Sequence, residues 1–294
     1  MRKAIYLSQD KTNVVEAFAH VFTLIRRYPE FEWYALIDTV FESADSDIFD
    51  QVTNAINCYE GDPKLNALAA VAPLVVPMLD NDDSAHRLRF LLTHCSARPM
   101  LSFIATKVNG TKALDDFRNF YMVSTDDNQE MLLRFADTRV LPNLQSVLTA
   151  DQWGALCRNI VCWYYIGRDG RVAECRISNL STGTCSQLKL SNHQVDKLVE
   201  LSYPDILMSR IVESMPEAIP VSIARSSLYK LIADAYNIAR NYSIENEADI
   251  FSLAIAGCLT AGRSNEDVEL HRLLECKGWE AGNLGDEMLE KGII

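Results

Sequence analysis

The hydrophobic positions in the first half of the chain alternate between helical spacing and short, continuous apolar runs. Residues 11–27 repeat apolar side chains at the spacing of an amphipathic helix. Residues 31–38 form a compact apolar and aromatic run that is typical of a buried strand. The alternation continues with a strand at 100–106 and a helix at 111–121, for which Thr111 is the expected N-cap. This order predicts an α/β or α+β fold in which helices cover a mixed or partly parallel sheet.

The most distinct local pattern predicts a β-hairpin. Residues 159–166 are apolar and aromatic, residues 168–170 form an Arg-Asp-Gly turn, and residues 171–177 return with alternating apolar positions. Aromatic side chains are favoured anchors at protein interfaces. In strands such as these, however, we interpret them mainly as core residues.

A second distinct segment has the sequence LRFADTRVL at residues 133–141. We predict a strand over 130–137 that runs directly into a helix over 139–148, with Asp137 positioned to cap that helix. Because apolar residues flank the charges on both sides, the strand is expected to lie inside the sheet.

The charged side chains of this segment have two interpretations. Arg134 and Arg139 are expected to pair with nearby carboxylates such as Asp38, since a charge near the core is tolerated only when it is paired. On this structural interpretation Arg134 and Asp137 act as scaffold, whereas Arg139 is more exposed and is allowed a direct partner contact. A role of the whole segment in recognising a partner stays open as the alternative.

The pattern changes near residue 180, after which every predicted element is helical. Residues 249–260 are apolar nearly all round, which predicts a central buried helix. We therefore place a boundary near 185, between an α/β domain at 1–185 and an all-helical domain at 186–294. Residues 241–294 carry 4 basic and 11 acidic side chains, a net charge of −7 that would attract a basic partner segment.

Composition excludes several classes of function. The 294 residues include 28 Lys and Arg against 40 Asp and Glu, and the net charge of −12 argues against nucleic-acid binding. No glycine-rich phosphate loop, HExxH motif or paired-cysteine zinc spacing is present in the sequence, so we expect neither a cofactor nor a metal. No signal-peptide core and no run long enough to span a membrane is found, which predicts a cytoplasmic protein without membrane contact.

An enzymatic alternative rests on clustered side chains. Paired carboxylates act as general acids and bases or bind metals, so a hydrolase- or nuclease-like activity is the competing hypothesis. Adjacent His94 and Cys95 could suggest a base beside a nucleophile, but neighbouring residues on a helix point in different directions. Solvated loops and helix N-termini explain acidic runs more simply. The acidic runs comprise Asp45, Asp47 and Asp50; Asp80, Asp82 and Asp83; and Asp126 and Asp127.

Four motifs occur in an order that is similar to a known family. They are WYALID at 33–38, CYEGDP at 58–63, AVAPLV at 70–75 and LRFADTRVL at 133–141. In this order they resemble the N-terminal domain of type VI secretion effector adaptors, also called effector chaperones, over roughly residues 30–165. The last motif departs from the family pattern at Thr138, where a proline is usual.

The resemblance implies a function without catalysis. Such adaptors bind one toxic effector in the bacterial cytoplasm and help to load it onto the secretion spike, a VgrG tip or a PAAR-type cap. The α/β part would then be the adaptor domain and the helical part the partner-specific domain. The family motifs place five residues as structural or partner-contacting positions, namely Asp38, Arg134, Phe135, Asp137 and Arg139.

Overall fold

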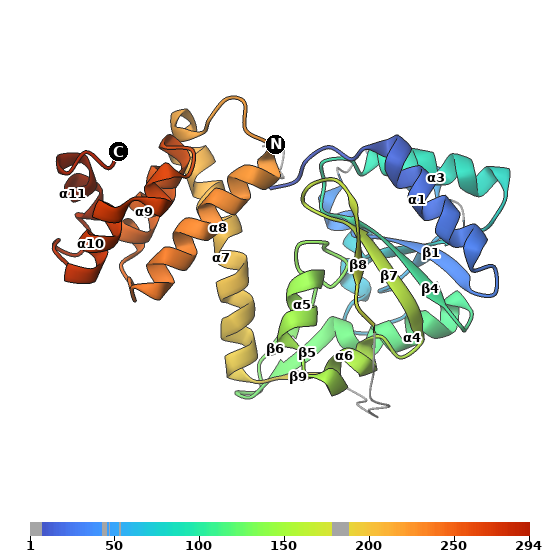
Figure 1. Cartoon of the computed structure of the whole chain (residues 1–294). Coiled ribbons are helices and arrows are strands. Elements are labelled where there is room, and N and C mark those ends of the chain that lie inside the picture. Colours follow the sequence, from blue (N-terminus) through green and yellow to red (C-terminus); the bar gives the residue numbers. More distant parts are fainter. Residues whose placement is uncertain (1–7, 43–45, 47, 53, 178–187) are drawn as a thin grey trace. The chain divides into compact units, whose positions relative to one another are not determined.

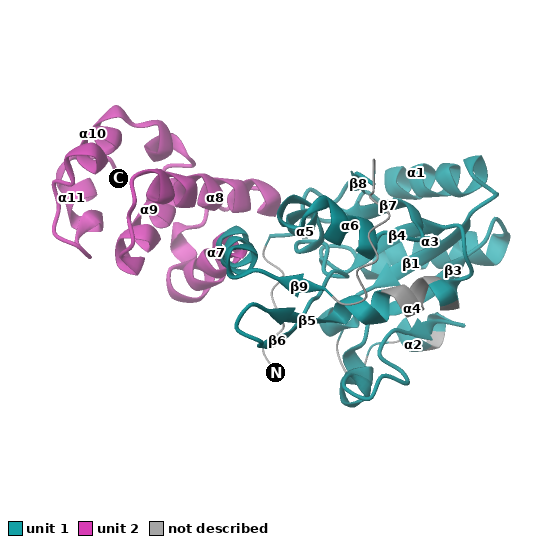
Figure 2. Cartoon of the chain, turned by 90° about the horizontal axis from the view of Figure 1, so that it is seen from below, with its two compact units in different colours: residues 1–201 teal, residues 202–294 magenta. Residues whose placement is uncertain are grey.

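The computed structural model describes most of the chain, namely residues 8–42, 46, 48–52, 54–177 and 188–294. The chain folds into two compact units, unit 1 (1–201) and unit 2 (202–294), which Figure 2 shows in different colours. The division falls within helix α7 (Asn192–Ser214). The boundary predicted near residue 185 lies outside the described residues.

Unit 1 is built around a six-stranded sheet, and its strands pair antiparallel throughout the described part (Figure 1). Strand β1 lies in the middle, where it pairs with β3 on one side and with β4 on the other. The strands in spatial order are β2 (Ile56–Asn57), β3 (Leu74–Met78), β1 (Glu32–Ile37), β4 (Leu101–Thr106), β7 (Ile160–Ile166) and β8 (Val172–Cys175).

Both faces of this sheet are buried, which explains why its central strands are apolar almost continuously. On one face, helices α1 (Val14–Arg27) and α3 (Asp82–His94) cover a core that includes Trp33 and Ile37. On the opposite face, Leu36 joins a second core with the helices α4 (Gly110–Tyr121), α5 (Leu141–Val147) and α6 (Ala150–Leu156). Side chains of β1 alternate between the two cores, as the pleat of a strand requires.

A second, three-stranded sheet has the order β6 (Glu130–Leu132), β5 (Met122–Thr125), β9 (Lys189–Leu190). Its β5–β9 pairing is parallel. The fold is therefore mixed α+β, as predicted. Short connections complete unit 1: the 3₁₀ helices η1 (Thr39–Phe41) and η2 (Asn66–Val71) and the helix α2 (Ile48–Gln51).

Some predictions of local structure are wrong. The six-stranded sheet is antiparallel rather than mixed or partly parallel, and β9 is a strand within the region 186–294 that was predicted to be all helical. The strand expected over 130–137 ends at Leu132 and forms an exposed edge of the small sheet, so it does not lie inside a sheet. The next residues form turns, because two backbone N–H groups bond to the Asp137 carbonyl and turn the chain into α5. The N-cap of α4 is Asn109, two residues before the predicted Thr111; its side chain accepts a hydrogen bond from Lys112 N at 3.0 Å.

Unit 2 is helical, and its central element is the helix α9 (Glu247–Leu259), as predicted from the apolar pattern. Eight of its 13 residues are buried. Around it lie the C-terminal part of α7 and the elements η3 (Pro216–Ala218), α8 (Arg225–Asn241), η4 (Arg263–Glu266), α10 (Val268–Cys276) and α11 (Leu284–Glu290). None of the helices in the described part of the chain is long and apolar enough to cross a membrane.

Candidate functional site

The five family-motif residues lie in one corner of unit 1, where the end of β1 meets the turn before α5. Arg134 Nη2 donates to Asp38 Oδ2 at 2.7 Å and lies 3.8 Å from Asp137 Oδ2. Arg139 binds the same Asp137 carboxylate through two nitrogens, at 3.1 and 2.8 Å. The predicted pairing of Arg134 with Asp38 is thus confirmed, and Arg139 pairs with Asp137 instead.

The two arginines of this corner are partly exposed, while their carboxylate partners are buried. The side chains of Arg134 and Arg139 are 31% and 25% exposed, against 1% and 2% for Asp38 and Asp137. Arg139 is therefore not the more exposed arginine that we expected. Both guanidinium carbons also lie near the Phe41 ring, at 5.0 and 5.3 Å from its centroid, within cation–π range. The corner thus presents two guanidinium groups at its surface, each fixed by a buried carboxylate.

Asp137 does not cap the following helix, contrary to the sequence-based prediction. The N-cap of α5 is Val140, which makes no side-chain capping bond. The Asp137 carboxylate instead accepts from Arg139 N at 2.9 Å and from the Arg139 side chain. Asp137 therefore organises the turn rather than the helix end.

Two further residues of the motif are buried in the structure. Phe135 packs its ring 4.7 Å from that of Tyr121 and 5.0 Å from that of Phe117, within the second core. Thr138 N donates to Pro99 O at 3.0 Å. A proline at 138, usual in the resembling family, has no N–H and cannot form this bond.

A second buried carboxylate group adjoins the corner and was not found from the sequence. Glu42, directly after η1, accepts hydrogen bonds from His94 Nε2 and Arg98 Nη1, each at 2.9 Å. Burial acts to raise the pKa of Glu42, but the bonds from His94 and the charge of Arg98 outweigh it and hold that pKa below its ordinary value. Glu42 is thus a charged anchor for the start of the 95–99 loop.

Asp38 shows the opposite balance. Burial raises the pKa of its carboxyl group, and the Arg134 guanidinium beside it offsets only part of that effect. Among the described residues, Arg134 is the cation that pairs with Asp38. Loss of Arg134 would therefore leave the buried Asp38 carboxylate without a cation.

Some of the groups considered for catalysis are buried or ion-paired in the described structure. Burial raises the pKa of the Cys95 thiol to about 12, which keeps it protonated at neutral pH. Asp80 pairs with Arg26, and Asp126 pairs with Lys189. Asp45 and Asp47 lie outside the described residues. Among the residues that the structure describes, no group of three or more His, Cys, Asp or Glu side chains is arranged to hold a metal ion.

Exposed hydrophobic side chains lie on segments that neighbour this corner. In η2 none of the six residues is buried, although five of them are apolar. We use the term apolar rim for five large side chains of unit 1 that are each 37–42% exposed: Val40, Leu68, Val71, Met131 and Leu132.

Hydrogen bonds connect the segments that carry the apolar rim. Thr39 Oγ1 donates to Ala72 O at 2.8 Å, which joins η1 to the end of η2. Lys64, just before η2, forms an ion pair with Glu130 of β6. Exposed apolar residues gathered on neighbouring segments are typical of interaction surfaces. The rim was not found from the sequence, because its residues come from three separate segments of the chain.

Comparison with known proteins covers this same region. Residues 33–155 match the family described as Domain of unknown function (DUF4123). The match begins in β1 and ends in α6, so it includes the corner and the apolar rim. No curated protein and no solved structure matches the chain. The match to this family covers less than half of the chain and lies entirely within unit 1.

Proposed function

We propose that this protein is a cytoplasmic adaptor that binds one type VI secretion effector and delivers it to the VgrG or PAAR spike. The observation that carries the proposal is the DUF4123 match over residues 33–155, a family associated with type VI secretion effectors. The four motifs at 33–38, 58–63, 70–75 and 133–141 lie within that match in the family's order. The protein acts by binding and needs no catalytic group.

The two units divide the work in this proposal. The spike is the component that all such adaptors have in common, and unit 1 contains the part of the chain that matches a family. Unit 1 therefore docks on the spike, and its apolar rim supplies the contact area. The effector differs from one adaptor to the next, and unit 2, which has no family match, binds it.

The corner supports this division through rigidity. Asp38, Asp137 and Glu42 are each held by a cationic side chain, and they anchor η1 and the turn before α5. An ordered surface loses less conformational entropy on binding than a mobile one. The charged corner thus keeps the neighbouring rim in a fixed arrangement.

A reconstitution experiment tests the proposal. The protein is co-expressed with the toxin encoded beside its gene, and the complex is measured by size-exclusion chromatography with light scattering. We expect a stoichiometric complex and a higher soluble yield of the toxin, because binding to the folded state stabilises it by mass action. A toxin that is fully soluble, folded and secreted without this protein would contradict the proposal.

A further inference from the structure

An unassigned cavity lies within unit 2, between the loop that joins α8 to α9 and the loop that joins α10 to α11. Its volume is about 450 Å³. The first loop contributes Glu245 and its neighbours, and the second contributes Lys277 and Trp279. The buried carboxylate of Asp249, in the first turn of α9, lies on the cavity wall.

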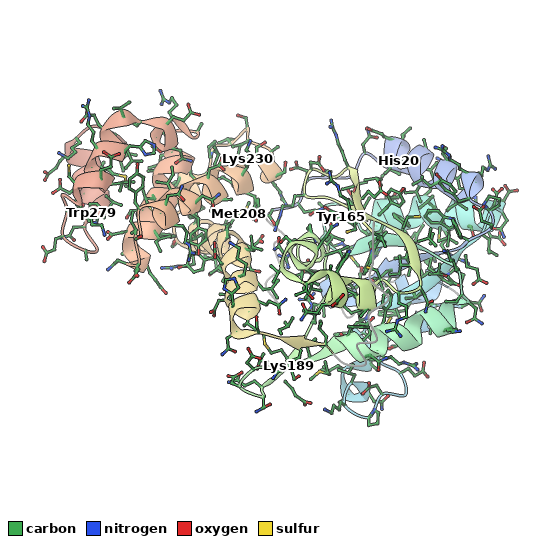
Figure 3. All side chains as sticks on the ribbon, turned by 60° about the horizontal axis from the view of Figure 1, so that its bottom comes forward. His20, Tyr165, Lys189, Met208, Lys230 and Trp279 are labelled. Carbon is green, nitrogen blue, oxygen red and sulfur yellow. The ribbon has the colours of Figure 1, made fainter. Side chains whose placement is uncertain are left out.

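Trp279, labelled in Figure 3, forms a preorganised aromatic wall. Its Nε1 donates to Asp249 Oδ2 at 2.9 Å, which fixes the indole plane. Asp249 is itself held by Gly282 N and Leu284 N, each bonded to Oδ1 at 3.1 and 3.0 Å. Trp279 is partly exposed, whereas the other three tryptophans are at most 6% exposed and all lie in unit 1. A large aromatic side chain left open on a fixed loop is an interface feature.

The charge of the cavity favours a cation. Asp249 is 1% exposed, and its hydrogen bonds come from neutral N–H groups; among the described residues no Lys or Arg forms an ion pair with it. Glu245 adds a second carboxylate at the solvent-exposed edge of the cavity. Lys277 is the opposing charge in the cavity lining, and it is exposed to solvent on its loop.

Unit 2 already holds one of its own arginines by the same chemistry. The Arg210 guanidinium carbon lies 4.8 Å from the centroid of the Phe251 ring, and its Nη1 lies 3.6 Å from Glu247 Oε2. A planar guanidinium stacks on an aromatic face while its edge pairs with a carboxylate. The Trp279 cavity offers both elements without an internal guanidinium among its lining residues.

We propose that the Trp279 cavity binds an arginine side chain of a partner polypeptide, stacked on the indole and paired with Glu245. The net negative charge of residues 241–294 draws a basic segment towards it. The inference rests on the proposed function, because we assign this basic segment to the effector. The cavity itself is tested with a short peptide, so its failure is distinguishable from failure of the adaptor role.

The experiment titrates the full-length protein with acetyl-Gly-Arg-Gly-amide and follows Trp279 fluorescence and the heat of binding. The control peptide carries citrulline, which has the shape of arginine without its charge. We expect saturable binding of the arginine peptide, with citrulline binding at least about threefold weaker. Trp279→Phe keeps an aromatic ring and gives the background signal of the three buried tryptophans.

Substitutions at two exposed residues of the cavity test whether it prefers a cation, because they should change the affinity for the arginine peptide in opposite directions. Glu245→Gln should weaken arginine binding about two- to fivefold, and Lys277→Gln should strengthen it by a similar factor, because each changes one rim charge. The opposite pair of signs would show that the cavity prefers an anion and would overturn the proposal. Equal binding of the arginine and citrulline peptides, or no saturable binding by either, would also overturn it.

Discussion

At the scale of single residues, the corner is held by buried carboxylates that pair with partly exposed arginines. Asp38 and Arg134 lie in two of the sequence motifs, and their pairing was predicted because a charge inside an apolar run requires a partner. The contacts of Glu42 with His94 and Arg98 were missed, because 52 residues separate Glu42 from His94 and no local pattern links them. The bond from Thr138 N to Pro99 O was missed for the same reason.

The first prediction concerns Arg134. Arg134→Ala leaves the Asp38 carboxylate buried without its cation, and we expect unit 1 to lose about 2–3 kcal/mol of unfolding free energy. This value is below that of a fully buried pair because Arg134 is partly exposed. Denaturant unfolding followed by the three buried tryptophans of unit 1 measures the loss.

The matched control for Arg134 is Arg26→Ala, which removes an exposed pair with Asp80. It should cost less than about 1 kcal/mol. Equal losses for the two variants would show that the corner pair is no more than a surface ion pair. An Arg134 variant that unfolds like the wild type yet fails to bind a partner would make the corner a recognition site rather than scaffold.

The second prediction concerns the pH dependence contributed by Glu42. Its pKa is held below its ordinary value of 4.5, so its contribution to stability is present above about pH 4.5 and is lost as the pH falls through the lowered pKa. Glu42→Gln should therefore be less stable than the wild type at neutral pH, and the difference should shrink in acid.

Unfolding free energies between about pH 3 and pH 7 measure this difference. Glu130→Gln serves as the control, since Glu130 forms an exposed pair with Lys64 and should show little pH-dependent effect. A constant difference between the Glu42 variant and the wild type across the range would contradict the assignment.

At the scale of elements, the sequence located the buried helices and strands and the β7–β8 hairpin well, and the small second sheet poorly. β1 and α9 were predicted because burial on two faces or all round leaves a continuous apolar run. β5 was missed because it follows α4 without a turn signal. β6 was predicted too long, since Leu133, Phe135 and Ala136 are apolar because they pack into the core from turns rather than from a strand.

The third prediction concerns the part of the apolar rim that lies on η2. The double variant Leu68→Asp and Val71→Asp places two charges on η2, whose side chains are already exposed, so the fold should be retained. We expect binding to the purified spike protein to weaken about tenfold or more, because apolar contact area is replaced by carboxylates that must be desolvated. Surface plasmon resonance measures the affinity.

The control for the rim variant is Val15→Asp on α1, which is 77% exposed and lies before the family match. It should bind the spike protein like the wild type. Equal weakening by the two substitutions would show a general effect of added negative charge. Unchanged binding by the rim variant would remove η2 from the docking surface.

At the scale of the whole molecule, the sequence predicted a mixed α+β part followed by helices, and the structure confirms that fold class. The division into units falls at 201/202, inside α7, where no change of composition marks it. The Trp279 cavity was not foreseen either, because two separate loops and a buried aspartate form it together. Features assembled from distant segments leave no short signature in one sequence.

The most direct test of the adaptor role is secretion from the native bacterium with this gene deleted. We expect the cognate effector to disappear from the culture medium while the VgrG spike protein is still secreted, and the wild-type gene to restore effector export. A chain carrying the Leu68→Asp and Val71→Asp substitutions should fail to restore it. Unchanged secretion of the effector in the deletion strain would show that this protein is not its adaptor.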